Sequence, residues 1–352
     1  MVAVILDKNA FDAALIDGSR RQMASAYRDL RASESETLAA LLDDNGDLLA
    51  DLRERRPCPI CGAPSDSVPV LIKARGVSYL TCPGCGLTYA RDVLTPAGER
   101  RLFEATPFSE QYSAIRANPA YGKLEAAKAR YIVGRAMAVL PPSLGPAPRT
   151  LDIGAGGGAM MRAARAAGGR AEGIEANPSF VDRLRADGLE VARGLFPEDW
   201  PADRTGFAVV TMLDVLEHVR DPCRLVASVR GILAPGGLAV VQVPNLNSLV
   251  IRVEGAANNN FCPSHWSFFT RRTLEMVMTR CGFVKLFDET IISEIDRLEG
   301  ADIQRVRSTF AELTGDTLVD PSALSVDELH RRYLGYKVLG LYQSIETNGC
   351  IG

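Results

Sequence analysis

Short apolar runs alternate with amphipathic stretches through the second half of the chain, from Arg149 onward. The stretches between these runs have helical periodicity, so we expect a mainly parallel sheet with helices on both faces. The pattern predicts an α/β fold with one doubly wound, seven-stranded sheet in residues 149–352. The runs that have the length and composition of strands are residues 149–153, 170–175, 190–193, 207–213, 238–243, 283–288 and 336–342.

The first 148 residues lack this alternation and divide into three predicted segments. Residues 1–56 form an N-terminal helical segment, because Leu and Ala recur at helical spacing over 9–56 and predict two or three packing helices. Residues 57–92 hold two cysteine pairs around a β-prone stretch and indicate a separate small module. Residues 93–148 predict a helical linker or cap, which the proline-rich residues 141–148 close.

A helical insertion is predicted between the sixth and seventh strands, at residues 290–333. It carries five basic and nine acidic residues, which favours a cap or an interface element with His330 at the surface. No apolar run reaches the roughly 18 residues of a spanning helix. The N-terminus breaks its apolar stretch at Asp7 and Lys8, unlike a signal peptide. We therefore expect a cytoplasmic protein without a membrane span.

The overall composition is that of an ordinary globular protein of two or three units. Of the 352 residues, 47% are hydrophobic and 24% are charged, which excludes wholesale disorder and a collagen-like chain. The 40 Lys and Arg residues against 43 Asp and Glu residues give a net charge of −3. No segment concentrates basic residues, so nucleic acid is disfavoured as the main partner.

Four of the eight cysteines form two CxxC pairs, Cys58 with Cys61 and Cys82 with Cys85, which 20 residues separate. This spacing is typical of a structural Zn²⁺ site, in which four thiolates complete a tetrahedron. Gly62 and Gly86 allow a tight turn behind the second thiolate of each pair. The alternatives are four free thiols or two disulfides, but no thioredoxin-like context surrounds either pair. We interpret the other cysteines as small hydrophobic residues: Cys223, Cys262, Cys281 and Cys350.

A glycine-rich stretch, Leu-Asp-Ile-Gly-Ala-Gly-Gly-Gly at residues 151–158, follows the first strand of the predicted sheet and opens a helix over 159–167. About 20 residues later Glu175 ends the next strand, where a carboxylate can accept both hydroxyls of a ribose. A Rossmann dehydrogenase also has a glycine-rich turn and an acidic residue at these places. A dehydrogenase nevertheless fits this sequence poorly, because Asp152 stands two residues before the first glycine, a Leu-Ala-Pro-Gly-Gly turn precedes the fifth strand, and no Tyr-x-x-x-Lys pair follows.

Four further segments between residues 149 and 287 accompany the glycine-rich stretch: GIEANP, TMLDVLEHVRDP, LAPGGLAVVQVPN and HWSFFTRRTLEMVMTRCGF. Together they resemble class I S-adenosylmethionine-dependent methyltransferases, in particular the group of ubiquinone-biosynthesis O-methyltransferases. The resemblance implies the strand order 3-2-1-4-5-7-6 with the last strand antiparallel. The CxxC pairs also look like those that precede methyltransferase domains in bacterial biosynthetic clusters.

The resemblance implies S-adenosyl-L-methionine as cofactor and assigns residues to it. Asp152 orders the loop and approaches the methionine amino group through water, while Glu175 binds the ribose. Ala176 flanks the adenine and Leu195 faces its edge. The remaining expected contacts are the backbone of Gly154, Ala155 and Gly156, and Leu213 at the end of the fourth strand.

His218 is one candidate for the base, in the stretch Asp214-Val-Leu-Glu217-His218 just after the fourth strand. A short helix would place Asp214, Glu217 and His218 on one face. The resemblance implies that such a cluster can hold a divalent cation, here Mg²⁺ or a similar ion. The alternative is that Glu217 and His218 only tie the helix start to neighbouring loops.

His265 is the other candidate, in a long loop that covers the acceptor in the family that the chain resembles. An imidazole titrates near neutral pH, which suits a general base for a hydroxyl group. Trp266, Phe268 and Phe269 form either its apolar wall or the core beneath the loop. Further candidates for cofactor or acceptor contacts are Tyr112 and Tyr121.

The first hypothesis for the function is methyl transfer to an oxygen of a small biosynthetic acceptor, such as a sugar or glycan, a peptide, a polyketide or a phenolic intermediate. A second is RNA methylation with the zinc module gripping RNA, although residues 51–100 hold only seven basic against five acidic side chains. A third is a cofactor-binding scaffold whose zinc module binds a protein. The sequence is compatible with a homo-oligomer and does not identify the acceptor.

Overall fold

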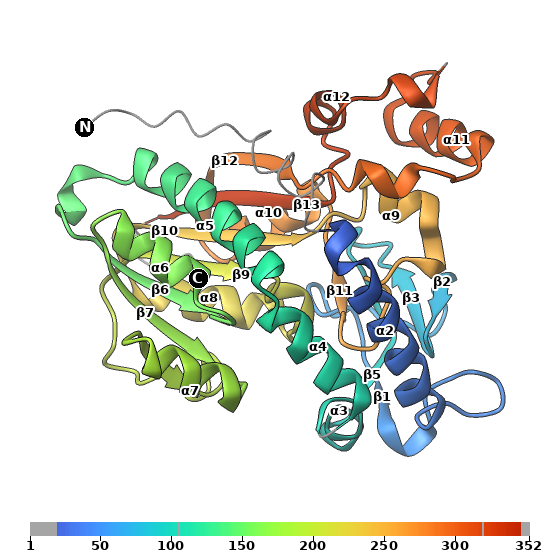
Figure 1. The fold of residues 1–352 in the computed structure, drawn as a ribbon, viewed down its shortest axis with the longest axis horizontal. Coiled ribbons are helices and arrows are strands. Elements are labelled where there is room, and N and C mark those ends of the chain that lie inside the picture. Colours follow the sequence, from blue (N-terminus) through green and yellow to red (C-terminus); the bar gives the residue numbers. More distant parts are fainter. Residues whose placement is uncertain (1–19, 105, 319, 346–352) are drawn as a thin grey trace.

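The computed structural model describes residues 20–104, 106–318 and 320–345 (Figure 1). Its main sheet has seven strands in the order β8-β7-β6-β9-β10-β13-β12, which is the predicted order 3-2-1-4-5-7-6. β13 runs antiparallel to both of its neighbours, so the predicted orientation of the last strand is also confirmed. The strands are β6 (Arg149–Ile153), β7 (Arg170–Glu175), β8 (Glu190–Arg193), β9 (Phe207–Leu213), β10 (Leu233–Pro244), β12 (Phe283–Ile291) and β13 (Lys337–Ser344).

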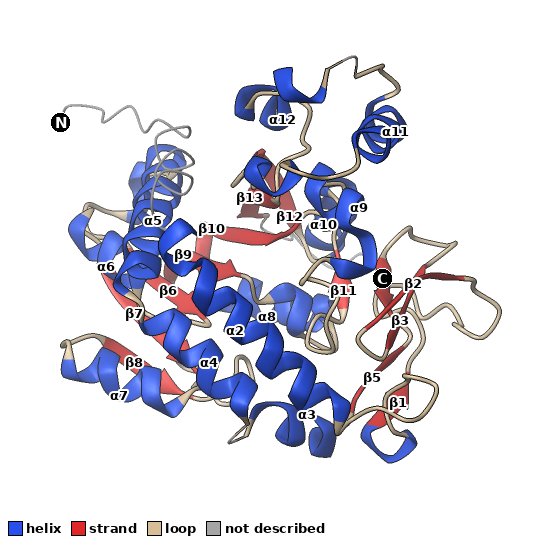
Figure 2. Cartoon of the chain, turned by 45° about the vertical axis from the view of Figure 1, so that its right-hand side comes forward, coloured by secondary structure: helices blue, strands red, loops and turns tan. Residues whose placement is uncertain are grey.

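Helices cover both faces of this sheet because successive apolar side chains of a strand point to opposite sides (Figure 2). On β9, Val209 packs in the core with α5, α6 and α7, whereas Val210 packs in the core with α8 and α10. The helices on the first side are α5 (Pro119–Val139), α6 (Ala159–Ala166) and α7 (Pro178–Ala186). Those on the second side are α8 (Pro222–Ile232) and α10 (Arg271–Arg280).

The segment before the sheet is helical as predicted. It contains α3 (Pro96–Phe103), α4 (Pro107–Ala117) and α5, followed by the 3-10 turn Pro142–Leu144. Proline opens each of the three helices, and the side chains of Thr95, Thr106 and Asn118 cap their first turns. α4 and α5 follow one another diagonally across the front of the molecule in Figure 1.

The structure describes residues 20–56 of the N-terminal segment. Within residues 20–56 the structure has one α-helix, α2 (Arg20–Ala39), which packs against α4. Residues 40–49 form turns around Gly46 and a Leu42–Leu48 bridge, because the Asp-Asn-Gly stretch favours a reversal over a second helix. A 3-10 turn at Ala50–Leu52 and the strand β1 (Arg53–Arg55) follow. The prediction of two or three helices covers residues 9–56, and because residues 9–19 lie outside the described ones, it stays a prediction.

The cysteine segment forms a small sheet that a distant part of the chain completes. Its strands are β2 (Val70–Ala74), β3 (Val77–Thr81) and β4 (Thr88–Ala90), and a fourth strand, β11 (Ser267–Phe268), pairs with β4. The neighbouring β5 (Asp92–Leu94) pairs with β1. Residues of the candidate acceptor loop are thus hydrogen-bonded to this cysteine module.

The insertion is helical, with the 3-10 turns Ile295–Leu298 and Pro321–Ala323 and the helices α11 (Ile303–Thr314) and α12 (Val326–Arg331). Its apolar side chains pack on α9 (Leu249–Glu254) in a core of their own, around Leu249, Val306 and Phe310. The expectation that His330 lies at the surface is wrong: its side chain is buried, and Nδ1 lies 3.0 Å from Oγ1 of Thr290. No helix in the described part of the chain is long and apolar enough to cross a membrane.

Candidate active site

The glycine-rich turn joins β6 to α6 at the carboxyl end of the sheet. Gly154 and Gly158 have φ values of 73° and 74°, a left-handed conformation that side chains other than glycine rarely adopt. A Cβ at Gly158 would also come within 2.5 Å of the Leu184 side chain. The backbone N–H groups of Gly154 and Ala155 both donate to the Ile174 carbonyl, which fixes the turn against β7.

Glu175 is fixed to the glycine turn at the end of β7. Its Oε2 accepts from the Gly156 N–H at 2.8 Å, and its Oε1 accepts from the Asn177 N–H at 2.7 Å. Each carboxylate oxygen has two lone pairs, so both oxygens can still accept a further hydrogen bond. The geometry therefore suits a carboxylate that receives two hydroxyl groups.

Asp152 lies beneath the same turn and is 6% exposed. Burial raises the pKa of Asp152 to about 7, although Thr211 donates a 2.6 Å hydrogen bond to its Oδ1. A cationic group nearby would favour the charged carboxylate. Asp152 is thus a poised acceptor for an ammonium group, directly or through water.

The three apolar residues assigned to the cofactor lie at the same edge. Leu213 is the half-buried last residue of β9, Ala176 is exposed just after β7, and Leu195 follows β8 with 60% of its surface exposed. An exposed leucine beside a polar turn can cover a flat apolar ligand such as a purine. The structure therefore brings all the predicted cofactor residues to the carboxyl ends of β6 to β9.

Glu217, His218 and His265 meet next to this edge, although 46 residues separate the two histidines. One ligand atom from each lies within 4.8 Å of the others. The two imidazole rings contact edge to face, with centroids 4.6 Å apart. The structure therefore joins the two base candidates, which the sequence suggested separately, in one cluster of side chains.

The hydrogen bonds of this cluster show which ring nitrogen of His218 carries the proton and which polar atoms lack a partner. Nδ1 of His218 lies 2.8 Å from the Ser264 carbonyl oxygen, which can only accept, so Nδ1 carries the proton and Nε2 keeps its lone pair. Nδ1 of His265 and both carboxyl oxygens of Glu217 are buried and have no hydrogen-bond partner among the described residues. These atoms are the ones an additional group, such as an acceptor hydroxyl, could satisfy.

Burial governs the protonation of the same groups. It lowers the pKa of His265 well below its usual value, helped by the charges of His218 and Lys337. It raises the pKa of Glu217 well above its usual value, together with the neighbouring Asp214 carboxylate. Burial and the neighbouring charges therefore favour the neutral form of both His265 and Glu217.

Contrary to the expectation from the sequence, Asp214 does not share a helix face with Glu217 and His218. The helix is only a 3-10 turn, Leu216–His218, and Asp214 precedes it with φ 55°. Its Oδ1 lies 2.7 Å from Nζ of Lys337, and its Oδ2 accepts a 3.1 Å hydrogen bond from Gln242. Lys337 opens β13, and its position beside Asp214 follows from the sheet order, so no local sequence signal could have found it.

The loop of His265 is fastened to the cysteine module. The Ala90 N–H donates to the Trp266 carbonyl at 2.9 Å, and the Trp266 N–H donates to the Glu217 carbonyl at 2.8 Å. Tyr79 of β3 donates its hydroxyl to the Cys262 carbonyl at 2.8 Å. A chain of hydrogen bonds thus runs from the small sheet through Trp266 to Glu217.

The aromatic residues after His265 lie in the core beneath the loop. The buried rings of Phe268, Phe261 and Tyr79 pack together, with centroids 4.7 to 5.3 Å apart. Phe269 is also buried, and Trp266 is 7% exposed with its indole N–H donating to the Pro263 carbonyl. The ring of Phe268 also lies beside that of His265, with centroids 6.0 Å apart, so the two alternatives are not exclusive.

The four predicted cysteine ligands form one cluster, with their sulfur atoms all within 4.8 Å of one another. Sγ of Cys58 lies 3.5 Å from that of Cys85, and Sγ of Cys61 lies 3.4 Å from that of Cys82. Four thiolates bound to one Zn²⁺ at about 2.3 Å have sulfur atoms roughly 3.8 Å apart, so the cluster fits this ion. Gly62 and Gly86 have φ values of 71° and 79°, as their expected role behind each second thiolate requires.

Comparison with known proteins confirms the resemblance that the sequence motifs suggest. Residues 125–286 match the family model described as a methyltransferase domain. A ubiquinone biosynthesis O-methyltransferase of Xanthomonas oryzae pv. oryzae is 36% identical over 103 residues, which are 28% of this chain and 43% of that protein. The protein of the same name from Cereibacter sphaeroides is 36% identical over 115 residues, 31% of this chain and 47% of that protein.

The matched region thus spans less than half of these relatives. Among solved structures, a chain of the complex between the Haloferax volcanii Trm112 methyltransferase activator and the putative methyltransferase is 18% identical. The alignment covers 68% of this chain and 97% of that chain, with a TM-score of 0.47. The methyltransferase likeness therefore rests on the family model and the curated relatives.

Proposed function

We propose, since residues 125–286 match a methyltransferase domain, that this chain transfers a methyl group from S-adenosyl-L-methionine to an oxygen of a small biosynthetic acceptor. The observation that carries the proposal is the arrangement around the glycine turn. Glu175 accepts the Gly156 N–H at 2.8 Å and keeps lone pairs for a ribose, while the buried Asp152 suits the methionine ammonium group. Both residues lie at the carboxyl edge of the sheet, next to the cluster of Glu217, His218 and His265.

In this proposal His265 is the general base. As the acceptor oxygen attacks the methyl carbon, the C–S bond breaks with its electron pair on sulfur, and His265 takes the proton of the acceptor hydroxyl. The ring of His218, which contacts that of His265 edge to face, holds it in place. Because the sulfonium is already a good leaving group, the protein mainly aligns the reactants and excludes water.

A divalent cation is the alternative means of activating the acceptor. The donor set of two imidazoles and one carboxyl group suits a transition metal better than the expected Mg²⁺, which prefers oxygen ligands. The Lys337 ammonium group, 2.7 Å from Asp214, already neutralises the acid next to the cluster. The first observation argues only against Mg²⁺, whereas the second favours the metal-free route.

We further propose that Cys58, Cys61, Cys82 and Cys85 bind one structural Zn²⁺, because all four sulfurs converge with no room for a substrate. The ion would stabilise the small sheet that holds the loop of His265. The segment boundaries at 56, 92 and 148 remain part of this proposal, with the qualification that residues 267–268 join the small sheet.

Calorimetric titration tests the proposed cofactor directly. S-adenosyl-L-methionine, or its demethylated product S-adenosylhomocysteine, is expected to bind with one molecule per chain, while NAD is expected not to bind. NAD binding without S-adenosylmethionine binding would return the dehydrogenase hypothesis and overturn the proposal.

A further inference from the structure

We propose that Arg116, on α4, binds an oxyanion group of the methyl acceptor, either a carboxylate or a phosphate. That the bound anion belongs to the methyl acceptor rests on the proposed function, but the anion site itself can be tested on its own. It would make the acceptor an anionic molecule and give it a fixed anchor away from the hydroxyl that reacts.

The first observation is that the guanidinium group of Arg116 has spare donors. It lies against the rings of Tyr112 and Tyr121, with its central carbon 5.3 and 5.4 Å from the two ring centroids. One of its five N–H groups donates to the Tyr121 hydroxyl at 2.6 Å. Its Nε is shielded from solvent and has no hydrogen-bond partner among the residues that the structure describes. A buried donor without a partner is costly, so a missing acceptor group is indicated.

The second observation comes from the other described arginines that stack on aromatic rings. Seven of them also lie within 4.0 Å of a carboxylate: Arg135, Arg149, Arg204, Arg220, Arg271, Arg297 and Arg332. Arg56 instead donates to three backbone carbonyls. Among these described arginines, Arg116 alone has neither a carboxylate within 4.0 Å nor hydrogen bonds to backbone carbonyls. An anion from outside the chain would supply the missing acceptor.

The third observation concerns the positive charges that act on Asp214, of which Arg116 supplies one. Burial tends to raise the pKa of Asp214, but the positive charges of Lys337, Lys128 and Arg116 together hold it below its usual value. Lys337 has Asp214 as its partner at 2.7 Å, and Lys128 has Glu125 at 2.8 Å. Arg116 is therefore the cation of this group for which no carboxylate partner is found in the described chain.

The chemistry of the guanidinium group then selects the ligand. Its planar fork of N–H donors matches the two oxygens of a carboxylate or a phosphate and forms two parallel hydrogen bonds. The tyrosine rings on Arg116 keep the fork in one orientation and limit the entropy lost on binding. A ligand fixed here would keep its orientation while a hydroxyl reaches His265.

The experiment measures anion binding to the full chain loaded with S-adenosylhomocysteine. Inorganic phosphate and acetate are titrated separately at constant ionic strength, and the shift of the thermal unfolding midpoint gives each affinity. Arg116→Met is expected to weaken binding of the preferred anion at least about tenfold, since a hydrogen-bonded charge is removed. Arg116→Lys keeps the charge without the fork and is expected to fall between wild type and Arg116→Met.

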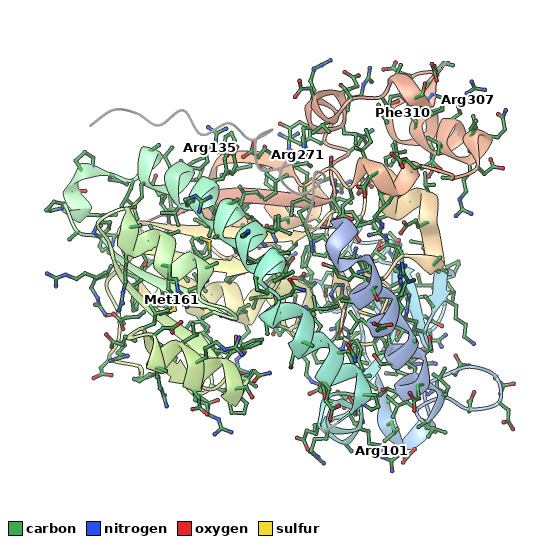
Figure 3. All side chains as sticks on the ribbon, in the orientation of Figure 1. Arg101, Arg135, Met161, Arg271, Arg307 and Phe310 are labelled. Carbon is green, nitrogen blue, oxygen red and sulfur yellow. The ribbon has the colours of Figure 1, made fainter. Side chains whose placement is uncertain are left out.

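The matched control is Arg135→Met. Arg135 also stacks on a tyrosine, but it lies near the C-terminal end of α5, whereas Arg116 lies at the end of α4 (Figure 3). Glu289 lies 3.8 Å from the Arg135 guanidinium group, so the loss of Arg135 is expected to leave anion binding unchanged. If Arg116→Met is too unstable for a titration, Arg116→Lys decides by the same criterion.

Stabilisation by phosphate alone assigns a phosphorylated acceptor, and stabilisation by acetate alone assigns a carboxylated one. The proposal is overturned if wild type binds neither anion, or if both Arg116 variants bind them as wild type does. If S-adenosylhomocysteine itself does not bind, the proposed function fails, and the same titration of the unloaded chain still decides whether Arg116 is an anion site.

Discussion

The candidate site has a cofactor half and an acceptor half, and the two are built in different ways. The cofactor half comes from consecutive strand ends: Asp152, the glycine turn, Glu175 and Leu195 all lie within residues 152–195. The acceptor half gathers Arg116, His218, His265 and Lys337 from four distant parts of the chain. Only this half depends on the cysteine module, through the hydrogen bonds of Trp266. Its geometry is thus set by long-range packing, whereas the cofactor half is set by local turns.

The strongest test of this difference removes the zinc site. Structural Zn²⁺ contributes roughly 10–16 kcal/mol to the folding of small modules, so Cys82→Ser should unfold the small sheet and free the loop of His265. Elemental analysis of wild type should find close to one zinc per chain. Hydrogen exchange at the Trp266 amide should rise strongly in the variant, while the affinity for S-adenosylhomocysteine stays within about threefold.

The control for this test is Cys223→Ser, because Cys223 lies on α8 and outside the cysteine cluster. It should keep both the metal and the protection of Trp266. Protein purified without chelator that contains no zinc would contradict the structural site.

The second test targets the base. His265→Ala should lower turnover by about 10²–10⁴ once an acceptor is available, while cofactor affinity stays nearly unchanged. Chelators should have no effect on turnover. Loss of activity with chelator and its return with a divalent ion would instead support the cation alternative, and full turnover in both His218→Ala and His265→Ala would leave catalysis to proximity alone.

The protonation of His265 can be measured without an acceptor. Proton NMR can follow the imidazoles as the pH falls, since the chain has only three histidines. The ring of His265 should remain neutral below its ordinary pKa of about 6.5, because burial disfavours the charged form. The variant His265→Ala identifies its signal. A ring that titrates at or above the ordinary pKa would contradict this effect of burial.

The third test uses the buried carboxyl group of the cofactor half. Asp152 has a native pKa of about 7 against roughly 3.9 in the unfolded chain. Its neutral form therefore favours folding fully below about pH 4, and this contribution is lost as the pH rises towards 7. Asp152→Asn, which stays neutral, should be more stable than wild type by about 2–4 kcal/mol at pH 8 and by only about 1 kcal/mol at pH 4.5.

Urea unfolding of the cofactor-free protein at the two pH values measures this effect. The control is Asp182→Asn, an exposed residue of α7. An Asp152→Asn variant that is less stable than wild type at pH 8 would show that the charged carboxylate is already satisfied without the cofactor.

The same contrast explains what could be predicted from the sequence. The strand order, the cysteine cluster and the cofactor residues follow from short motifs whose partners are close in the chain or fixed by family resemblance. The pairing of Asp214 with Lys337, 123 residues later, and the spare donors of Arg116 follow only from how distant segments pack. For the same reason His330 looked like a surface residue, although it is buried against Thr290 of β12.

The most direct test of the two-part site is calorimetric titration of S-adenosylhomocysteine into matched variants of the two halves. Glu175→Ala should weaken binding by about 1–3 kcal/mol through the loss of charge-assisted ribose hydrogen bonds, whereas His265→Ala should bind as wild type does. Glu190→Ala, at an exposed acid on β8, is the control and should have no effect. Equal weakening by Glu175→Ala and His265→Ala, or full affinity in Glu175→Ala, would contradict the division of the site into a cofactor half and an acceptor half.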